Sequence, residues 1–129
     1  MRELRYYLEL TDNAHRDQAP ISFSVAESLL RGMDWKLPPP DADPESEPAA
    51  PFMLFLDEGE SFFMLMPEDC GLRITARVLD KWNLLGLVTK DKTFTLNFGV
   101  LDTEESLKLL KLFYEDNYPS LRALEKQYN

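Results

Sequence analysis

The chain has 129 residues, 44% of them hydrophobic and 12% aromatic, a composition that suits one ordinary domain with its own core. Its 23 acidic and 14 basic residues leave a formal net charge of −9, which argues against binding to nucleic-acid phosphates or to anionic membranes. No window approaches the run of about 18 apolar residues that a membrane-spanning helix needs. The single cysteine, Cys70, excludes an internal disulfide framework and favours a reducing, cytoplasmic compartment. The charged first ten residues do not fit a secretory signal peptide.

The excess of negative charge is confined to about one third of the chain. Residues 37–72 contain no lysine or arginine and nine acids: Asp41, Asp43, Glu45, Glu47, Asp57, Glu58, Glu60, Glu68 and Asp69. The rest of the chain is balanced, with 14 acidic and 14 basic residues. A segregated block of charge creates a directional field that attracts a cationic partner, although a simple solvated loop also explains it.

The first third of the chain predicts one strand and one helix. Apolar residues alternate with polar ones over residues 3–11, as in a half-buried strand. Residues 12–20 are polar and are expected to form a connection. Ser24 and Glu27 have the spacing of a capping box, which predicts a helix that ends at about Met33.

Residues 37–51 read LPPPDADPESEPAAP and hold six of the nine prolines. Such a segment can neither pair in a sheet nor bury much apolar area. We therefore predict an extended, polyproline-like or partly disordered acidic loop at residues 38–51, too short to separate two domains.

Residues 51–67 read PFMLFLDEGESFFMLMP, with two apolar runs on either side of an acidic turn. This pattern predicts a β-hairpin with Gly59 at a position of positive φ. Both runs are apolar at consecutive positions, which is typical of central strands covered on both faces. A helix layer accounts for one cover, and a partner could supply the other.

The last part of the chain predicts further strands and then helices. Alternation over residues 72–78 indicates a one-sided strand, and residues 84–89 and 93–100 read as a second hairpin that turns at residues 90–92. Asp102 with Glu105 caps a helix, and a short terminal helix follows Pro119. The predicted fold is a single α+β domain over residues 1–129, with a mainly antiparallel sheet of five to six strands and helices packed on one face.

The sequence contains no recognisable catalytic or metal-binding motif. His15 is the only histidine, and Cys70 follows two acids, which raise rather than lower the pKa of a thiol. Asp41, Asp43 and Glu45 match the first ligands of a calcium loop, but the required glycine and the final glutamate are missing. We therefore expect no catalytic residue, no metal site and no cofactor.

In its size, acidity, α+β layout and lack of catalytic motifs, the chain resembles the small acidic immunity proteins that bacteria make against their own polymorphic or secreted toxins. The resemblance implies a non-enzymatic cytoplasmic inhibitor that masks the active site of a basic toxin or effector with its carboxylates. We expect the contact to use the nine acids of residues 37–72, with desolvation of apolar side chains such as Phe52, Phe62, Phe63 and Met64.

Three alternatives remain open. An adaptor or chaperone would shield an apolar segment of a secreted cargo with the two-sided hairpin instead of the acids. A small enzyme would use carboxylates that the sequence does not single out. A mimic of DNA charge would need acids at phosphate spacing on a rigid surface, for which the proline-rich loop is a poor scaffold.

Overall fold

A computed structural model describes residues 2–9, 15–32, 52–57, 61–68, 71–84 and 88–128. Six antiparallel strands form one sheet in the order β2-β1-β3-β4-β5-β6. The strands are β1 (Leu4–Glu9), β2 (His15–Ile21), β3 (Phe52–Leu56), β4 (Phe62–Glu68), β5 (Gly71–Leu84) and β6 (Val88–Leu101). The helices are α1 (Phe23–Gly32), α2 (Thr103–Tyr114) and α3 (Tyr118–Tyr128).

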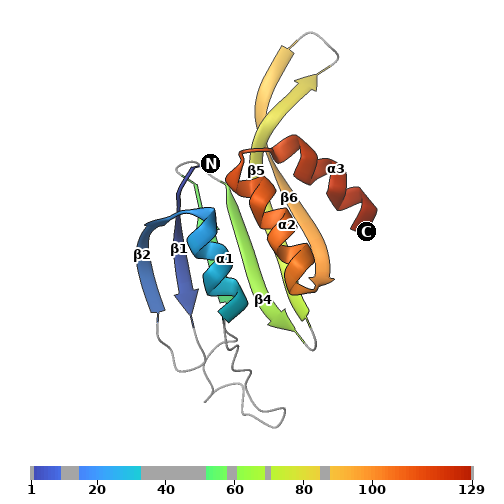
Figure 1. Ribbon diagram of the computed structural model, residues 1–129. Helices are drawn as coiled ribbons and strands as arrows, with labels where there is room; N and C mark the ends of the chain where they lie inside the picture. The colour runs from blue at the N-terminus through green and yellow to red at the C-terminus, as the bar shows by residue number, and fades with distance from the viewer. Residues whose placement is uncertain are drawn as a thin grey trace, which may run out of the picture.

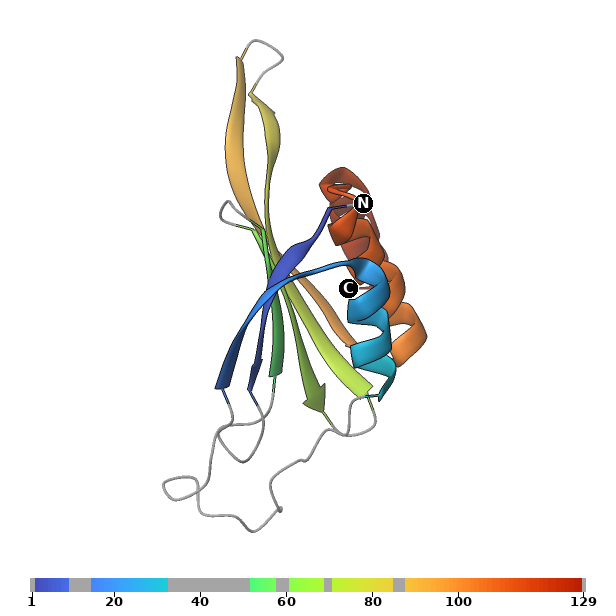
Figure 2. The ribbon, with the colours of Figure 1, turned by 60° about the vertical axis from the view of Figure 1, so that its left-hand side comes forward.

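The three helices lie on one face of the sheet (Figures 1 and 2). They cover the alternate strand residues that point toward them, and these side chains form one continuous core with α2, centred on Met53, Phe55, Phe63, Leu65, Ile74, Leu110 and Phe113. Burial of each such side chain contributes about 1.5–3 kcal/mol to folding. The predicted α+β class, the strand number and the one-sided helix layer are confirmed.

Strand β2 corrects the prediction of a polar connection before Ile21. Its sequence, HRDQAPI, lacks apolar alternation, yet it pairs with β1 from Ile21 opposite Leu4 to His15 opposite Glu9. The strand lies at the edge of the sheet, where Pro20 is tolerated. Pairing with β1, rather than local sequence preference, makes it a strand.

The start of α1 also differs from the prediction. Ser22, and not Ser24, caps the helix, because its Oγ accepts a hydrogen bond from the backbone N–H of Val25 at 3.3 Å and its carbonyl accepts from Ala26 at 3.0 Å. Glu27 pairs with Arg31 one turn later. The predicted cap of α2 is confirmed, since Asp102 Oδ1 accepts from the N–H of Glu105 at 2.8 Å.

Strands β5 and β6 form a longer hairpin than predicted. Residues 90–92 lie inside β6 and not in a turn. The pairing of β4 with β5 reaches only to Phe62 opposite Arg77, so beyond that point β5 pairs with β6 alone. The resulting two-stranded ribbon projects past the sheet (Figure 1).

Helix α3 fixes the base of this ribbon. Arg122 donates to Asp80 Oδ2 at 3.0 Å, and its guanidinium lies 3.6 Å from the centroid of the Phe94 ring. Asp80 belongs to β5 and Phe94 to β6. One side chain therefore holds both strands of the ribbon at the place where it leaves the sheet.

Candidate functional site

The two central strands, β3 and β4, have two different faces. Met53, Phe55, Phe63 and Leu65 point to the helices and are fully buried. The intervening side chains are half-buried on the opposite face, and no described helix or strand covers them (Figure 2). We call this set the apolar stripe: Phe52, Leu54, Leu56, Phe62, Met64 and Met66.

The sheet register shows what borders the apolar stripe. Leu56 stands opposite Phe62, and the next residues outward in the same row are Arg5 on β1 and Arg77 on β5. In the next row along the strands, the residues that stand side by side on β1, β3, β4 and β5 are Tyr7, Leu54, Met64 and Thr75. The stripe is therefore two strands wide, with polar residues on each side and an arginine on each side of its Leu56–Phe62 end.

The other end of the apolar stripe carries an ion pair. Arg73 donates two hydrogen bonds to the carboxylate of Glu68, one of them of 2.8 Å from Nη2 to Oε1. These bonds hold the pKa of Glu68 below its usual value. Glu68 is one of the acids predicted to contact a partner, and its charge is already balanced by a neighbour on β5.

Asp57, another predicted contact residue, is turned toward the interior. Its side chain is 12% exposed. Oδ1 accepts from the backbone N–H of Ser61 at 3.2 Å, and Oδ2 accepts from the Tyr118 hydroxyl at 2.7 Å. Asp57 thus closes the β3–β4 connection and ties it to the start of α3, a structural role that the sequence does not reveal.

Arg2 completes this internal network. Its Nη1 lies 3.6 Å from Asp57 Oδ2, and its Nη2 donates to the carbonyl of Phe113 at 2.7 Å and to the Tyr118 hydroxyl. The guanidinium also lies 5.4 Å from the ring centroids of both Phe113 and Tyr118. Burial, together with the hydrogen bond to Asp57, raises the pKa of Tyr118 to about 12. Tyr118 therefore stays protonated and donates to Asp57 at neutral pH.

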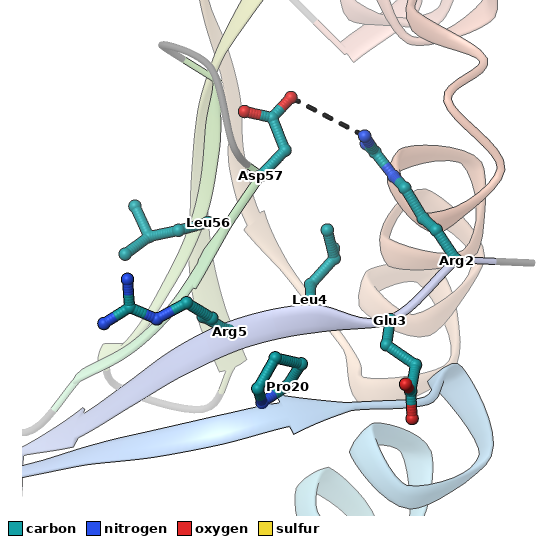
Figure 3. A pocket seen from close by; sticks show the side chains of 7 residues that line it. All are labelled: Arg2, Glu3, Leu4, Arg5, Pro20, Leu56 and Asp57. Carbon is teal, nitrogen blue, oxygen red and sulfur yellow. Dashed lines mark ion pairs between the residues drawn. The ribbon is translucent and has the colours of Figure 1, made fainter.

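A pocket of about 820 Å³ opens beside this network, where β1 begins and β2 and β3 end (Figure 3). Its lining combines two arginines, two acids and three apolar residues: Arg2, Arg5, Glu3, Asp57, Leu4, Pro20 and Leu56. Arg2 and Asp57 already pair with each other (Figure 3). Among the described residues, the lining contains no serine, cysteine or histidine that could serve as a nucleophile or base.

Phe62 lies on the apolar stripe, as the proposed contact requires, but Phe63 is fully buried under α2, and its predicted place at the contact is wrong. Strand β4 separates Phe62 from Glu68 by about 20 Å, at roughly 3.3 Å per residue. The other predicted contact acids lie outside the described residues: Asp41, Asp43, Glu45, Glu47, Glu58, Glu60 and Asp69.

Several residues of the site were not predicted as contacts. Leu54, Leu56 and Met66 could have been found, because every second position of a strand shares a face and Phe52, Phe62 and Met64 were already singled out. The arginines that border the stripe depend on long-range register, which one sequence does not disclose.

No group of three or more metal-ligating side chains occurs among the described residues. In the same part of the chain, no helix is long and apolar enough to cross a membrane. Comparison of the chain with protein-family models, with curated proteins and with solved structures finds no match.

Proposed function

We propose that this chain is a non-enzymatic binding protein of the immunity type, a cytoplasmic inhibitor that masks the active site of one basic toxin or effector. The observation that carries the proposal is the apolar stripe. Strands β3 and β4 are apolar at consecutive positions, yet the described structure covers only one of their faces. Apolar patches of this kind mark contact sites for other proteins.

The distribution of charge supports a basic partner. The described ranges hold 14 of the 23 acidic residues and 13 of the 14 basic ones, so nine acids and Lys36 fall in the remaining segments. Segments 10–14 and 69–70 and the end of segment 33–51 attach to the sheet at one end, at Glu9, His15, Phe52, Glu68 and Gly71. Together these three segments contain seven acids and one lysine. An acidic excess in these segments would speed the approach of a cationic protein.

The proposed mechanism has two stages. The acids steer the partner at long range, and close contact then removes water from the apolar stripe, with Leu54 and Met64 as its central side chains. Desolvation of such anchors supplies most of the affinity of an interface, while peripheral charges mainly change the association rate. Inhibition then follows from occlusion and needs no chemical step by this chain.

An adaptor or chaperone that shields an apolar cargo segment is the second candidate. It is favoured by the chemistry of the stripe itself, which is apolar, and whose acid on β4, Glu68, is already paired with Arg73. The two candidates differ in how association depends on the acids and on salt.

The experiment uses the full chain as immobilised bait in a lysate of its native host at low and at high salt. We expect a stoichiometric, basic prey that is lost with Met64→Lys and retained with the control Val25→Lys, because Val25 is an exposed residue of α1 away from the stripe. Simultaneous charge reversal of Asp41, Asp43, Glu45 and Glu47 should weaken capture and its salt dependence. Unchanged, salt-insensitive capture after charge reversal would contradict the steering role and favour the adaptor.

A further inference from the structure

We infer that the outer edge of β6, where it runs beside α3, is a docking site that takes an extended segment of a partner protein as a further strand of the sheet. The site consists of the backbone of Thr93 and Thr95 and of a pocket between β6 and α3. All of its residues are described, and none belongs to the apolar stripe. The inference therefore does not rest on the proposed function.

Two hydrogen bonds establish which backbone groups of β6 face outward, and the first lies on β5. Leu79 donates its backbone N–H to Ser61 Oγ, next to β4, at 2.9 Å, so it points away from β6. Leu79 stands opposite Thr93. Opposite residues of an antiparallel ladder either exchange both backbone hydrogen bonds or exchange none. The backbone N–H and C=O of Thr93 therefore point away from β5, toward the free edge.

The second hydrogen bond lies on β6 and leads to the same orientation. Asn97 donates its backbone N–H to Glu125 Oε2 of α3 at 3.2 Å, so this N–H also points away from β5. The register has no shift between Thr93 and Asn97, and Thr95 between them shares their orientation. Because β6 is the last strand of the sheet, the N–H and C=O groups of Thr93 and Thr95 have no hydrogen-bond partner among the described residues.

The next part of this edge is closed by the chain itself. Glu125 accepts from the N–H of Asn97, and Asn97 Oδ1 accepts from the N–H of Gly99 at 3.1 Å. Gly99 has a φ of 80°, outside the range of a regular strand. Proteins commonly block their edge strands against further pairing in such ways. The blocking stops short of Thr93 and Thr95, whose outward groups remain available to a partner.

A pocket of about 440 Å³ lies directly beside these open groups. Helix α3 runs alongside β6 and forms its other wall (Figure 1). The apolar part of the lining comes from both elements: Phe94 and Leu96 of β6, and Pro119 and Ala123, which are four residues apart on one face of α3. Every second side chain of an added strand would point to the helix side of the sheet. One of these side chains would enter the pocket.

The floor of the pocket is held in place by contacts within the chain. The Arg122 guanidinium lies 3.6 Å from the centroid of the Phe94 ring and donates to Asp80, and Lys92 Nζ lies 5.5 Å from the same centroid. A site that is already ordered loses little conformational entropy when a ligand binds. The pocket can therefore accept an apolar side chain without rearrangement of β6.

An extended segment suits this site better than other occupants. The outward groups of Thr93 and Thr95 repeat every second residue, about 7 Å apart, which is the spacing of the matching groups in another strand. An α-helix offers no such groups, because its backbone is hydrogen-bonded internally. A second copy of this chain would bring together two molecules that each carry a net charge of −9.

The test selects a ligand from a phage-displayed library of random dodecapeptides with the full chain as the immobilised target. The most enriched peptide is synthesised, and fluorescence anisotropy measures its binding. In the free protein, we expect the amide hydrogens of Thr93 and Thr95 to exchange with deuterium faster than that of Phe94, which faces β5. The peptide should slow the exchange at both threonines at least tenfold. Methylation of its backbone nitrogens at alternate positions should weaken binding at least tenfold, whereas methylation at the positions between should not.

Two substitutions and a matched control make the result specific. Thr95→Pro removes one outward N–H without removing a hydrogen bond to β5, and it should weaken binding at least tenfold. Ala123→Phe fills the pocket and should have an effect of the same size. Gln127→Phe adds the same ring at an exposed position of α3 outside the pocket lining and should leave binding unchanged. Because Ala123 is exposed, its variant keeps the test valid even if Thr95→Pro fails to fold.

Several outcomes would overturn the inference. They are failure to enrich any peptide, unchanged exchange at Thr93 and Thr95, an equal effect of methylation at every peptide position, and full binding to Ala123→Phe. Slow exchange at both threonines in a free protein that sediments as a dimer would assign the edge to a second copy instead. None of these measurements involves the apolar stripe, so failure here and failure of the lysate experiment are distinguishable.

Discussion

Strands β3 and β4 carry apolar side chains on both faces, but the described helices cover only one of these faces. Phe55, Phe63 and Leu65 on one face are fully buried, whereas Leu54, Phe62 and Met64 on the other are only half-buried. Neighbouring residues of the same strand thus serve different purposes. Residues on the helix side stabilise this chain, and we propose that those on the open side are kept apolar for a partner.

Replacement of two neighbouring phenylalanines by alanine, one at a time, should give the largest difference in unfolding free energy between the two faces. Phe63→Ala removes a ring packed 5.7 Å from Phe113 in the core and should cost about 3–5 kcal/mol of unfolding free energy. Phe62→Ala on the open face should cost about 1 kcal/mol or less, because surface substitutions leave no cavity. Urea unfolding of both variants measures the difference, and equal losses would show that the open face is also part of the core.

The network behind the β3–β4 connection should have the next largest effect. Asp57→Asn keeps the shape of the side chain but removes the nearer of the two carboxylates beside Arg2, which leaves only the exposed Asp116, 4.0 Å from Nη1. We expect a loss of about 1–3 kcal/mol in unfolding free energy. Urea denaturation would measure this, and an unchanged midpoint would mean that Asp57 is a surface acid in practice.

Alkaline pH should weaken the same network. The pKa of Tyr118 is raised to about 12 in the folded chain, above the value near 10 of an unfolded tyrosine, so the folded state holds this proton more tightly. The contribution of Tyr118 to the free energy of unfolding is therefore constant below pH 10 and falls as the pH rises from 10 to 12. Thermal midpoints across this range should fall less steeply in Tyr118→Phe. A slope identical to that of the wild type would contradict the raised pKa.

The smallest effect is expected at the ion pair on the open face. Glu68 and Arg73 are both well exposed, and exposed pairs contribute little because water and salt screen them. Glu68→Gln should leave the urea midpoint unchanged within error. A clear loss of stability would show that this end of the open face is more rigid than its exposure indicates.

The comparison of faces also explains which parts of the fold could be predicted. The alternation in residues 3–11 identified β1 as a half-buried strand, and the double apolar runs identified β3 and β4 as central strands, because side-chain burial follows directly from position in a strand. Strand β2 was missed because its conformation depends on pairing with β1. Residues 90–92 were read as a turn because charged residues are common in turns, although here they lie inside the β5–β6 ribbon.

The residues of the candidate site were likewise predictable only in part. Phe62 and Phe63 were both expected at the contact, and only Phe62 lies on the uncovered face, since the sequence alone does not say which face of a two-sided strand meets the helices. The role of Asp57 depends on Arg2 and Tyr118, which are 55 and 61 residues away in the sequence. Contacts across such separations arise only from the tertiary fold.

The clamp of Arg122 on Asp80 and Phe94 has a consequence for motion. Because one guanidinium holds both strands where the ribbon leaves the sheet, the base of the ribbon and α3 should move together as one rigid unit. A spin label at the exposed Ala123 would then report on the ribbon without altering it. Its distance to a second label at Thr95, on β6 just inside the clamp, should stay constant when a partner binds, even if both change their distance to α1.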